Sequence, residues 1–197
     1  MFDRSKAAAP RRGAPLAFCL ASTLCIAGAM ALPSDASAYN LEGPKWGGQP
    51  SSGCCANLGV QYNYVGQSYD ATGLFLGFAS WNHSFGSGVN VQISTVSSSV
   101  WTVQDTYNSG VSWDGMTSLN VGLDLNFSAA ALWMNSYYTG TYAQPTVNGV
   151  AAHEIGHSLG LAHSNACVLM QPSTLLRNVC NVYGPVQDDK NGVNSLY

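Results

Sequence analysis

Hydrophobic and polar positions alternate with a period of two in several short segments, as they do in a β-strand with one buried face. Three such segments occupy residues 60–65, 89–93 and 100–103. A fourth, 120–127, would place on one face Val121, Leu123, Leu125 and Phe127. We predict strands in these four segments, and either a further strand or a loop at 133–142.

Apolar residues recur at helical spacing in 68–82, which predicts a helix there, although Gly73 and Gly77 lower its helix propensity. Further helices are predicted at 147–159 and 185–197. The segments predicted to be irregular are 39–57 and 161–184. Strands followed by helices, without strict alternation of the two, indicate an α+β fold.

The first 38 residues have the features of a secretory signal peptide. A basic start is followed by an apolar run over 16–32 and by the small-residue cleavage sequence Ala-Ser-Ala at 36–38. A transmembrane anchor is the alternative, but it needs about 20 apolar residues. We therefore predict a signal peptide at 1–38 and one domain at 39–197. The product would be secreted and extracellular, or periplasmic in a bacterium.

Only 9% of the residues are charged, against about 25% in an average soluble protein. With seven Lys and Arg and a formal net charge of −3, the chain lacks the clustered basic residues that bind nucleic-acid phosphates. No second apolar span follows the first, so we expect no stable membrane anchor. We expect a soluble monomer.

Four cysteines lie after residue 38, and an even number in an exported domain indicates disulfides. We favour a bridge between Cys167 and Cys180, a local loop worth about 3 kcal/mol in the chain-entropy model. The neighbours Cys54 and Cys55 would then form a strained vicinal bridge or stay free. A crossed pattern that joins these two to the other pair is the open alternative.

The chemistry is concentrated in eleven residues, HEIGHSLGLAH, that begin at His153. His153 and His157 stand four residues apart, so both imidazoles project from one face of the predicted helix, as two ligands of one tetrahedral zinc would. Gly160 would end the helix in a left-handed cap and let His163 approach the same ion. Glu154 is better placed to contact a metal-bound water than to act as a ligand. Three protein ligands leave a fourth position for water, as in catalytic zinc sites.

The spacing H-E-x-x-H-x-x-G-x-x-H is the signature of metzincin zinc endopeptidases, and the sequence resembles their matrixin branch in two further features. Ser164 directly follows the third histidine, and residues 188–197, DDKNGVNSLY, are similar to the D-D-x-x-G-I-x-x-L-Y ending of that family. By resemblance, Met170 is the methionine that packs beneath the metal without binding it. Gln171 departs from the tyrosine usual at its position, which leaves the wall of the specificity pocket open.

The resemblance implies a zincin-like catalytic domain: a twisted five-stranded mixed sheet, an active-site helix and a small C-terminal lobe closed by a helix. It also implies one catalytic Zn²⁺, Glu154 as general base, and Asp188 and Asp189 as a brace for the methionine turn. The two aspartates fit equally well as charges at a helix N-terminus. The remaining acids are scattered at Asp70, Asp105, Asp114 and Asp124, so they form no clear calcium site. Calcium is left as an open alternative.

We therefore predict a secreted zinc endopeptidase that hydrolyses protein or peptide substrates with a water activated by Glu154. One alternative is an exported module that binds a polysaccharide or a surface partner and retains a vestigial zinc site. Another is a different metzincin branch, such as an astacin-like enzyme. Ser164 argues against astacin, where an acidic residue usually follows the third histidine.

Overall fold

A computed structural model of the protein describes residues 39–48, 55–62, 68–83 and 88–197. The predicted signal peptide, Cys54 and the last three residues of the strand predicted at 60–65 lie outside the described residues. Within the described part of the chain, no helix has both the length and the apolar character needed to cross a membrane.

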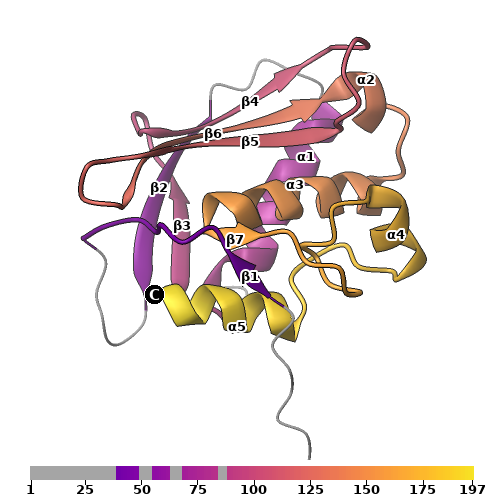
Figure 1. The fold of residues 1–197 in the computed structure, drawn as a ribbon. Helices are drawn as coiled ribbons and strands as arrows, with labels where there is room; N and C mark the ends of the chain where they lie inside the picture. Colours follow the sequence, from indigo (N-terminus) through magenta and orange to yellow (C-terminus); the bar gives the residue numbers. More distant parts are fainter. Residues whose placement is uncertain (1–38, 49–54, 63–67, 84–87) are drawn as a thin grey trace, which may run out of the picture. The chain divides into compact units, whose positions relative to one another are not determined.

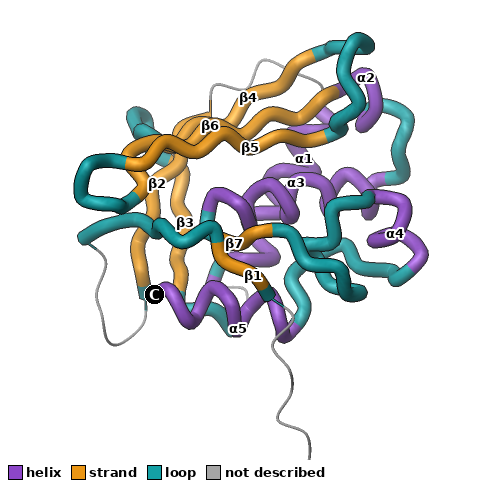
Figure 2. The backbone as a smooth tube through the Cα atoms, viewed as in Figure 1, coloured by secondary structure: helices purple, strands orange, loops and turns teal. Residues whose placement is uncertain are grey.

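The core of the domain is a mixed five-stranded sheet (Figures 1 and 2) with the order β3-β2-β4-β6-β5. Strand β5 runs antiparallel to β6, and the other neighbours are parallel. The antiparallel β5 is one edge of this sheet. The strands are β2 (Ala56–Tyr62), β3 (Val91–Thr95), β4 (Trp101–Thr106), β5 (Gly115–Val121) and β6 (Phe127–Asn135).

Two long helices lie on the same side of the sheet (Figure 1): α1 (Ser68–Trp81) and α3 (Gln144–Ser158). Three shorter helices are α2 (Ser136–Thr139), α4 (Thr174–Val179) and α5 (Gln187–Leu196). A separate two-stranded sheet pairs β1 (Asn40–Leu41) with β7 (Leu161–Ala162) between α3 and α5. This architecture is the predicted α+β fold.

The glycines of α1 allow close contact with α3. A Cβ atom at Gly73 would lie 2.6 Å from Val147 Cγ1, and one at Gly77 would lie 3.0 Å from the backbone nitrogen of Ala152. Because residues four apart share one helix face, both glycines face α3. They lower helix propensity, but they let α1 pack against the helix that bears the histidines.

Two buried tryptophans attach α3 to the rest of the core. The indole nitrogen of Trp81, in α1, donates to Ala152 O at 2.8 Å, and that of Trp46 donates to Ser158 O at 2.8 Å. Trp46 also stacks on Trp101 of β4, with ring centroids 5.9 Å apart. Burial of large aromatic surfaces with satisfied N–H groups stabilises the position of α3 at its middle and at its C-terminal end.

The strand predicted at 120–127 is wrong. β5 ends at Val121, β6 begins at Phe127, and the residues between them form a hairpin turn in which Leu125 has a φ of 62°. Leu123 and Leu125 are fully or largely exposed instead of facing a core. The apolar alternation is accidental here, because the turn geometry and the pairing of β5 with β6 place these side chains in solvent.

Two other segments and the cysteine pairing refine the sequence prediction. The ambiguous segment 133–142 ends a strand and then forms α2, and the segment 161–184, predicted to be irregular, contains β7 and α4. Cys167 is disulfide-bonded to Cys180 with Cα atoms 5.7 Å apart, so the crossed cysteine pattern is wrong. Cys55 is also disulfide-bonded.

Candidate metal centre

Helix α3 presents the first two histidines, and a glycine turn returns the chain toward them. Gly160 follows the end of α3 with a φ of 103°, a left-handed conformation that glycine adopts without strain. A Cβ atom there would also lie 2.8 Å from Leu196 Cδ1. The chain then passes through β7 and brings His163 over the helix.

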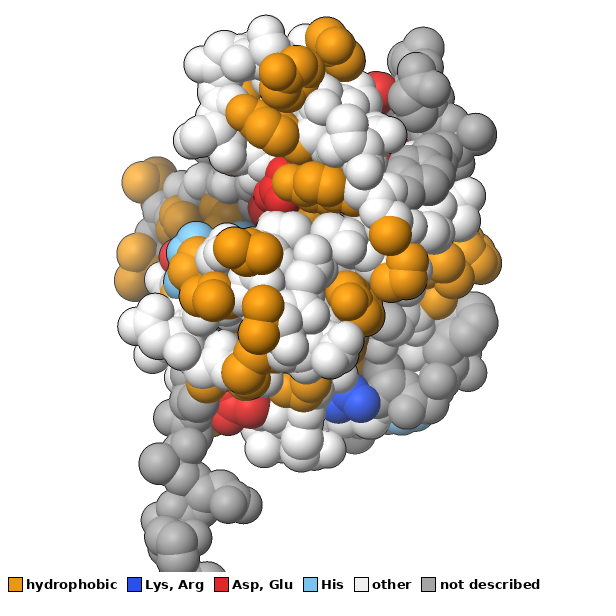
Figure 3. Space-filling view, turned by 90° about the vertical axis from the view of Figure 1, so that its right-hand side faces the viewer, with side chains coloured by type: hydrophobic (Ala, Val, Ile, Leu, Met, Phe, Trp, Pro, Cys, Tyr) orange, Lys and Arg blue, Asp and Glu red, His pale blue; other side chains and the backbone are white. Residues whose placement is uncertain are grey.

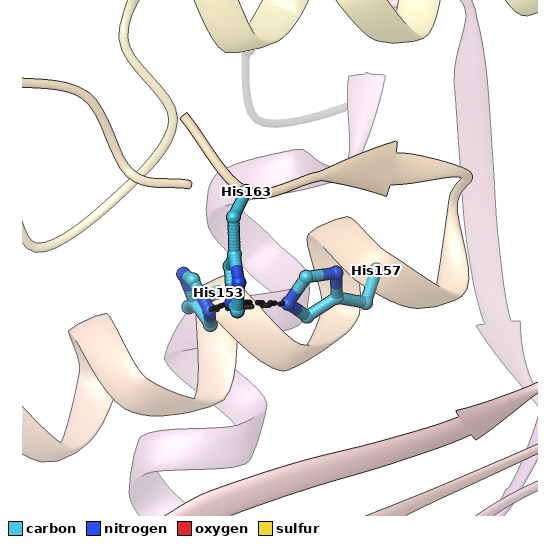
Figure 4. A group of neighbouring side chains, drawn as sticks. All are labelled: His153, His157 and His163. Carbon is cyan, nitrogen blue, oxygen red and sulfur yellow. Dashed lines mark hydrogen bonds between the residues drawn. The ribbon is translucent and has the colours of Figure 1, made fainter. Parts of the chain in front are cut away.

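The three imidazoles converge on one point (Figure 4). His153 Nε2 lies 3.2 Å from both His157 Nε2 and His163 Nε2, and the last two atoms are 3.1 Å apart. Three nitrogens at 2.0–2.1 Å from a tetrahedral zinc would be about 3.3–3.4 Å apart. The observed triangle is therefore close to the size that a zinc ion requires.

The Nδ1 atoms of two of the rings show what the facing Nε2 atoms can bind. His153 Nδ1 lies 2.7 Å from Leu169 O, and His157 Nδ1 lies 2.8 Å from Leu161 O. A carbonyl oxygen only accepts hydrogen bonds, so in a neutral ring each Nδ1 bears the proton and each Nε2 presents a lone pair. Converging lone pairs repel one another unless a cation lies between them, and this donor set fits zinc.

Burial and neighbouring charges shift the pKa values of these rings in different directions. Burial, together with the Arg177 guanidinium, lowers the pKa of His153 well below its usual range. Burial also lowers the pKa of the more exposed His163. Burial acts in the same direction on His157, but a hydrogen bond to Glu42 and the Glu154 carboxylate outweigh it and raise its pKa. The deepest ring is thus the one held most firmly in its neutral, metal-binding form.

Glu154 is buried beside the histidines, with its carboxylate fixed by β5. Thr117 Oγ1 donates to Glu154 Oε2 at 2.7 Å. A Cβ atom at Gly115 would lie only 2.8 Å from Glu154 Oε1, so glycine leaves the space that the carboxylate occupies. Burial raises the pKa of Glu154 above its usual value, which makes the carboxylate a better proton acceptor.

Met170 lies against the helix segment between the two helical histidines. A Cβ atom at Gly156 would lie 2.5 Å from Met170 Sδ, so the glycine admits the methionine. Asp189, which is fully buried in α5, accepts hydrogen bonds from Leu169 N at 3.0 Å, Met170 N at 3.2 Å and Val186 N at 2.9 Å. Asp188 takes no part in these three bonds.

The structure adds Glu42 and Asn40, residues that the sequence analysis left in an irregular arm. Glu42 Oε1 lies 3.4 Å from His157 Nδ1, and Asn40 Nδ2 donates to His163 O at 2.7 Å. Glu42 N also donates to Gly160 O at 2.8 Å. A two-residue strand has no readable alternation, so no pattern in the sequence indicates this contact.

Two hollows flank Glu154. A cleft of about 290 Å³ is lined by Glu42, Glu154, His157, His163 and part of β5. A cavity of about 440 Å³ is lined by His153, Glu154 and His163, and also by Asp114 and Arg177, which the sequence analysis did not assign to the site. The face drawn in Figure 3 is mostly hydrophobic or uncharged, with acidic atoms visible near the middle of the view.

Calcium receives no support from the structure. Among the described residues, the side chains that could jointly hold a metal ion are the three histidines. Asp124, for example, bonds to Asn126 within the hairpin turn at 3.2 Å and 3.0 Å. It serves as a turn residue.

Several known proteins are similar to this chain in sequence or in structure. Human neutrophil collagenase (Homo sapiens) is 42% identical over 78 residues, which are 39% of this chain and 15% of the collagenase. Myroilysin is similar in structure with a TM-score of 0.43 and 17% identity, over 64% of this chain and 54% of its own. High choriolytic enzyme 1, a hatching enzyme zinc-protease from Oryzias latipes (medaka fish), has a TM-score of 0.38 and 10% identity, over 60% and 50% of the two chains.

The matched segments therefore cover well under two thirds of these relatives. The sequence profile of one family, described as Matrixin, matches residues 62–197. This range includes the whole five-stranded sheet apart from most of β2, as well as α1, α3 and all three histidines. Because the match extends over well more than half of the chain, the chain belongs to the matrixin family.

Proposed function

We propose that the protein is a secreted zinc endopeptidase, with His153, His157 and His163 as the metal ligands and Glu154 as the general base. The observation that supports this most directly is the triangle of Nε2 atoms with sides of 3.1–3.2 Å. When bound, zinc would act as a Lewis acid that polarises the scissile carbonyl and lowers the pKa of the bound water.

The residues of the chain supply the proton transfers. Thr117 occupies Glu154 Oε2, which leaves Oε1 to accept a proton from the attacking water. Hydroxide oxygen bonds to the scissile carbonyl carbon, and Glu154 then returns the proton to the amide nitrogen as the carbon–nitrogen bond breaks. The buried carboxylate is well suited to this exchange, because its raised pKa favours uptake of the proton.

Strand β5 offers a place for the substrate backbone. It is an edge of the sheet, and Gly115, Met116, Thr117 and Leu119 of this strand line the cleft next to Glu154. An extended peptide could add to this edge through main-chain hydrogen bonds. The open edge thus supports a polypeptide substrate.

The test uses the protein expressed from residue 39 and a peptide library. We expect about one zinc per chain by elemental analysis, cleavage that chelators abolish and zinc restores, and near-total loss of cleavage in Glu154→Ala with zinc retained. Asp124→Ala, in the exposed hairpin turn, is the matched control and should leave the rate unchanged. Full proteolysis by Glu154→Ala would overturn the proposal, and a zinc-free protein that binds glycans would favour the binding-module alternative.

Secretion is tested separately, because residues 1–38 lie outside the described structure. The full chain expressed with its own N-terminus should be exported and cleaved after Ala38. N-terminal sequencing of the exported protein should therefore begin at Tyr39. A protein that stays in the cell with residues 1–38 attached would contradict this part of the proposal.

A further inference from the structure

The larger of the two hollows beside Glu154 has charged and polar walls. Its volume is about 440 Å³, in the range of ligand-binding cavities. Its lining includes side chains from the segment before β5, from α2 and the loop after it, and from α4 and the two residues before it. They are Ser112, Trp113, Asp114, Tyr138, Tyr142, Pro172, Ser173, Thr174 and Arg177.

Arg177 places a buried guanidinium against this cavity. Its exposed fraction is 3%, and it makes no salt bridge with a carboxylate of the described residues. Nη1 donates to Gln171 O at 2.5 Å and also lies 3.3 Å from His153 Nδ1, and Nη2 donates to Thr174 Oγ1 at 2.6 Å. A guanidinium has five N–H groups and is always charged in proteins, so these acceptors leave it with capacity for further hydrogen bonds.

Asp114 provides the opposite charge, and Thr174 connects the two. Thr174 Oγ1 accepts from Arg177 and donates to Asp114 Oδ2 at 2.7 Å, while Tyr142 OH donates to the same oxygen at 3.2 Å. The cavity thus contains one cation, Arg177, and a carboxylate, Asp114, separated by a hydroxyl group, and a second carboxylate, Glu154, lies in the same wall. The charges of Arg177 and Asp114 cancel as a pair, and the walls offer both hydrogen-bond donors and acceptors.

We propose that Arg177 and Asp114 make this cavity a specificity pocket for a carboxamide side chain, above all glutamine, at the substrate residue next to the scissile bond. The inference rests on the proposed peptidase function. A carboxamide oxygen accepts from Arg177 while its NH₂ group donates to Asp114, so one neutral side chain satisfies both groups.

Other side chains satisfy only part of the pocket. A leucine would displace water and offer no hydrogen bond to the remaining N–H groups of Arg177 or to Asp114, which is costly for buried polar groups. A glutamate would bind Arg177 but would face Asp114 and Glu154, and a lysine would bind Asp114 but would face Arg177. Pockets built to hydrogen-bond a substrate group reject analogues that lack it far more strongly than apolar pockets discriminate by size.

The first experiment compares four peptides that differ only at the residue after the scissile bond: glutamine, glutamate, lysine or leucine. We expect the wild-type kcat/KM for the glutamine peptide to exceed each of the others about tenfold or more. Cleavage of the leucine peptide as fast as or faster than the glutamine peptide would overturn the inference.

A charge switch gives the sharper test. Asp114→Asn leaves Arg177 as the one formal charge of the pair, so the ratio of glutamate to glutamine cleavage should rise about tenfold or more. Asp124→Asn makes the same charge change in the exposed hairpin turn and should leave the ratio unchanged. An unaltered ratio in folded Asp114→Asn protein contradicts the inference. If that variant does not fold, the order in which the wild type cleaves the four peptides tests the inference instead.

Binding separates this inference from the proposed function. Calorimetry with zinc-loaded Glu154→Ala protein should show tighter binding of the glutamine peptide than of the leucine peptide. If the wild type cleaves none of the peptides while this preference is present, the peptidase proposal fails and the pocket assignment stands. If all four peptides are cleaved and bound alike, the peptidase proposal stands and the pocket assignment fails.

Discussion

Two segments secure the histidines from opposite directions, and they differ in burial and in bonding. The turn around Met170 contacts His153 through Leu169 O and is fixed by buried Asp189 and by the disulfide between Cys167 and Cys180. The strand β1 contacts the other two histidines through its exposed residue Asn40 and the neighbouring Glu42. It has only two residues.

This difference separates a rigid part of the metal centre from an adjustable part. Buried hydrogen bonds without competing water, together with a covalent link, give His153 a fixed position before any metal binds. His163 is exposed, and its segment depends on a short surface pairing. We expect changes in the Met170 turn to affect folding, and changes in β1 to affect metal affinity.

The largest effect is expected from Asp189→Ala. It removes the acceptor of three backbone N–H groups, two of them buried with it, and should lower the free energy of unfolding by about 3–5 kcal/mol. Urea denaturation followed by circular dichroism measures this. Gln187→Ala, in the same helical turn but exposed, should change stability by less than about 0.5 kcal/mol; equal effects of the two changes would refute the assigned role.

The disulfide should contribute slightly less than Asp189 to the free energy of unfolding. Replacing both Cys167 and Cys180 by serine opens a link between residues 13 apart in sequence, for which the chain-entropy model gives about 3 kcal/mol. Thermal and urea unfolding of the double variant against wild type measure the loss. A change below about 1 kcal/mol would mean that Asp189 alone determines the rigidity of the turn.

Gly156→Ala tests the packing of Met170 on α3. The added methyl group would lie 2.5 Å from the sulfur, and overpacking of this kind costs about 1–3 kcal/mol. The cost should largely disappear in a Met170→Ala background, which a double-mutant cycle would show. Gly184→Ala, whose methyl group would meet Ser80 Cβ at an ordinary 3.5 Å, is the control and should be nearly neutral.

The smallest effect on folding is expected from Glu42→Gln. A partly exposed contact of 3.4 Å contributes less than about 1 kcal/mol to stability. Partners of ligand side chains nevertheless commonly change metal affinity by 10–100-fold, so we expect zinc to bind about tenfold more weakly. Competition with a chromophoric chelator measures this independently of activity. An unchanged affinity, equal to that of Asp124→Asn, would show that β1 does not tune the centre.

Local patterns predicted the parts of the molecule whose geometry is local. The spacing of His153 and His157 is set by one helical turn, and Gly160 is required by the left-handed turn that follows. The alternation at 120–127 predicted one continuous strand where a turn lies, although the same pattern correctly indicated strands at 89–93 and 100–103. A period of two says that alternate side chains share a face, but it does not say whether a turn interrupts the strand.

Contacts between distant segments could not be predicted in this way. Asp114 and Arg177 are joined through Thr174 although they lie on either side of α3 in the sequence. Asp189 was connected to the methionine turn only through resemblance to a family. Glu42 had no signal at all, because its partner His157 lies more than a hundred residues further along the chain.

The sequence by itself pointed to the three histidines, to Glu154 and to the family, because one helix and one turn place these groups and few other residue types could serve there. The tertiary structure alone decided which carboxylates support the histidines and which charges line the cavity beside Glu154. The physical reason is that burial and pairing are properties of packed surfaces. The charge of a residue can be read from the sequence, but the group with which it pairs is determined only by the folded chain.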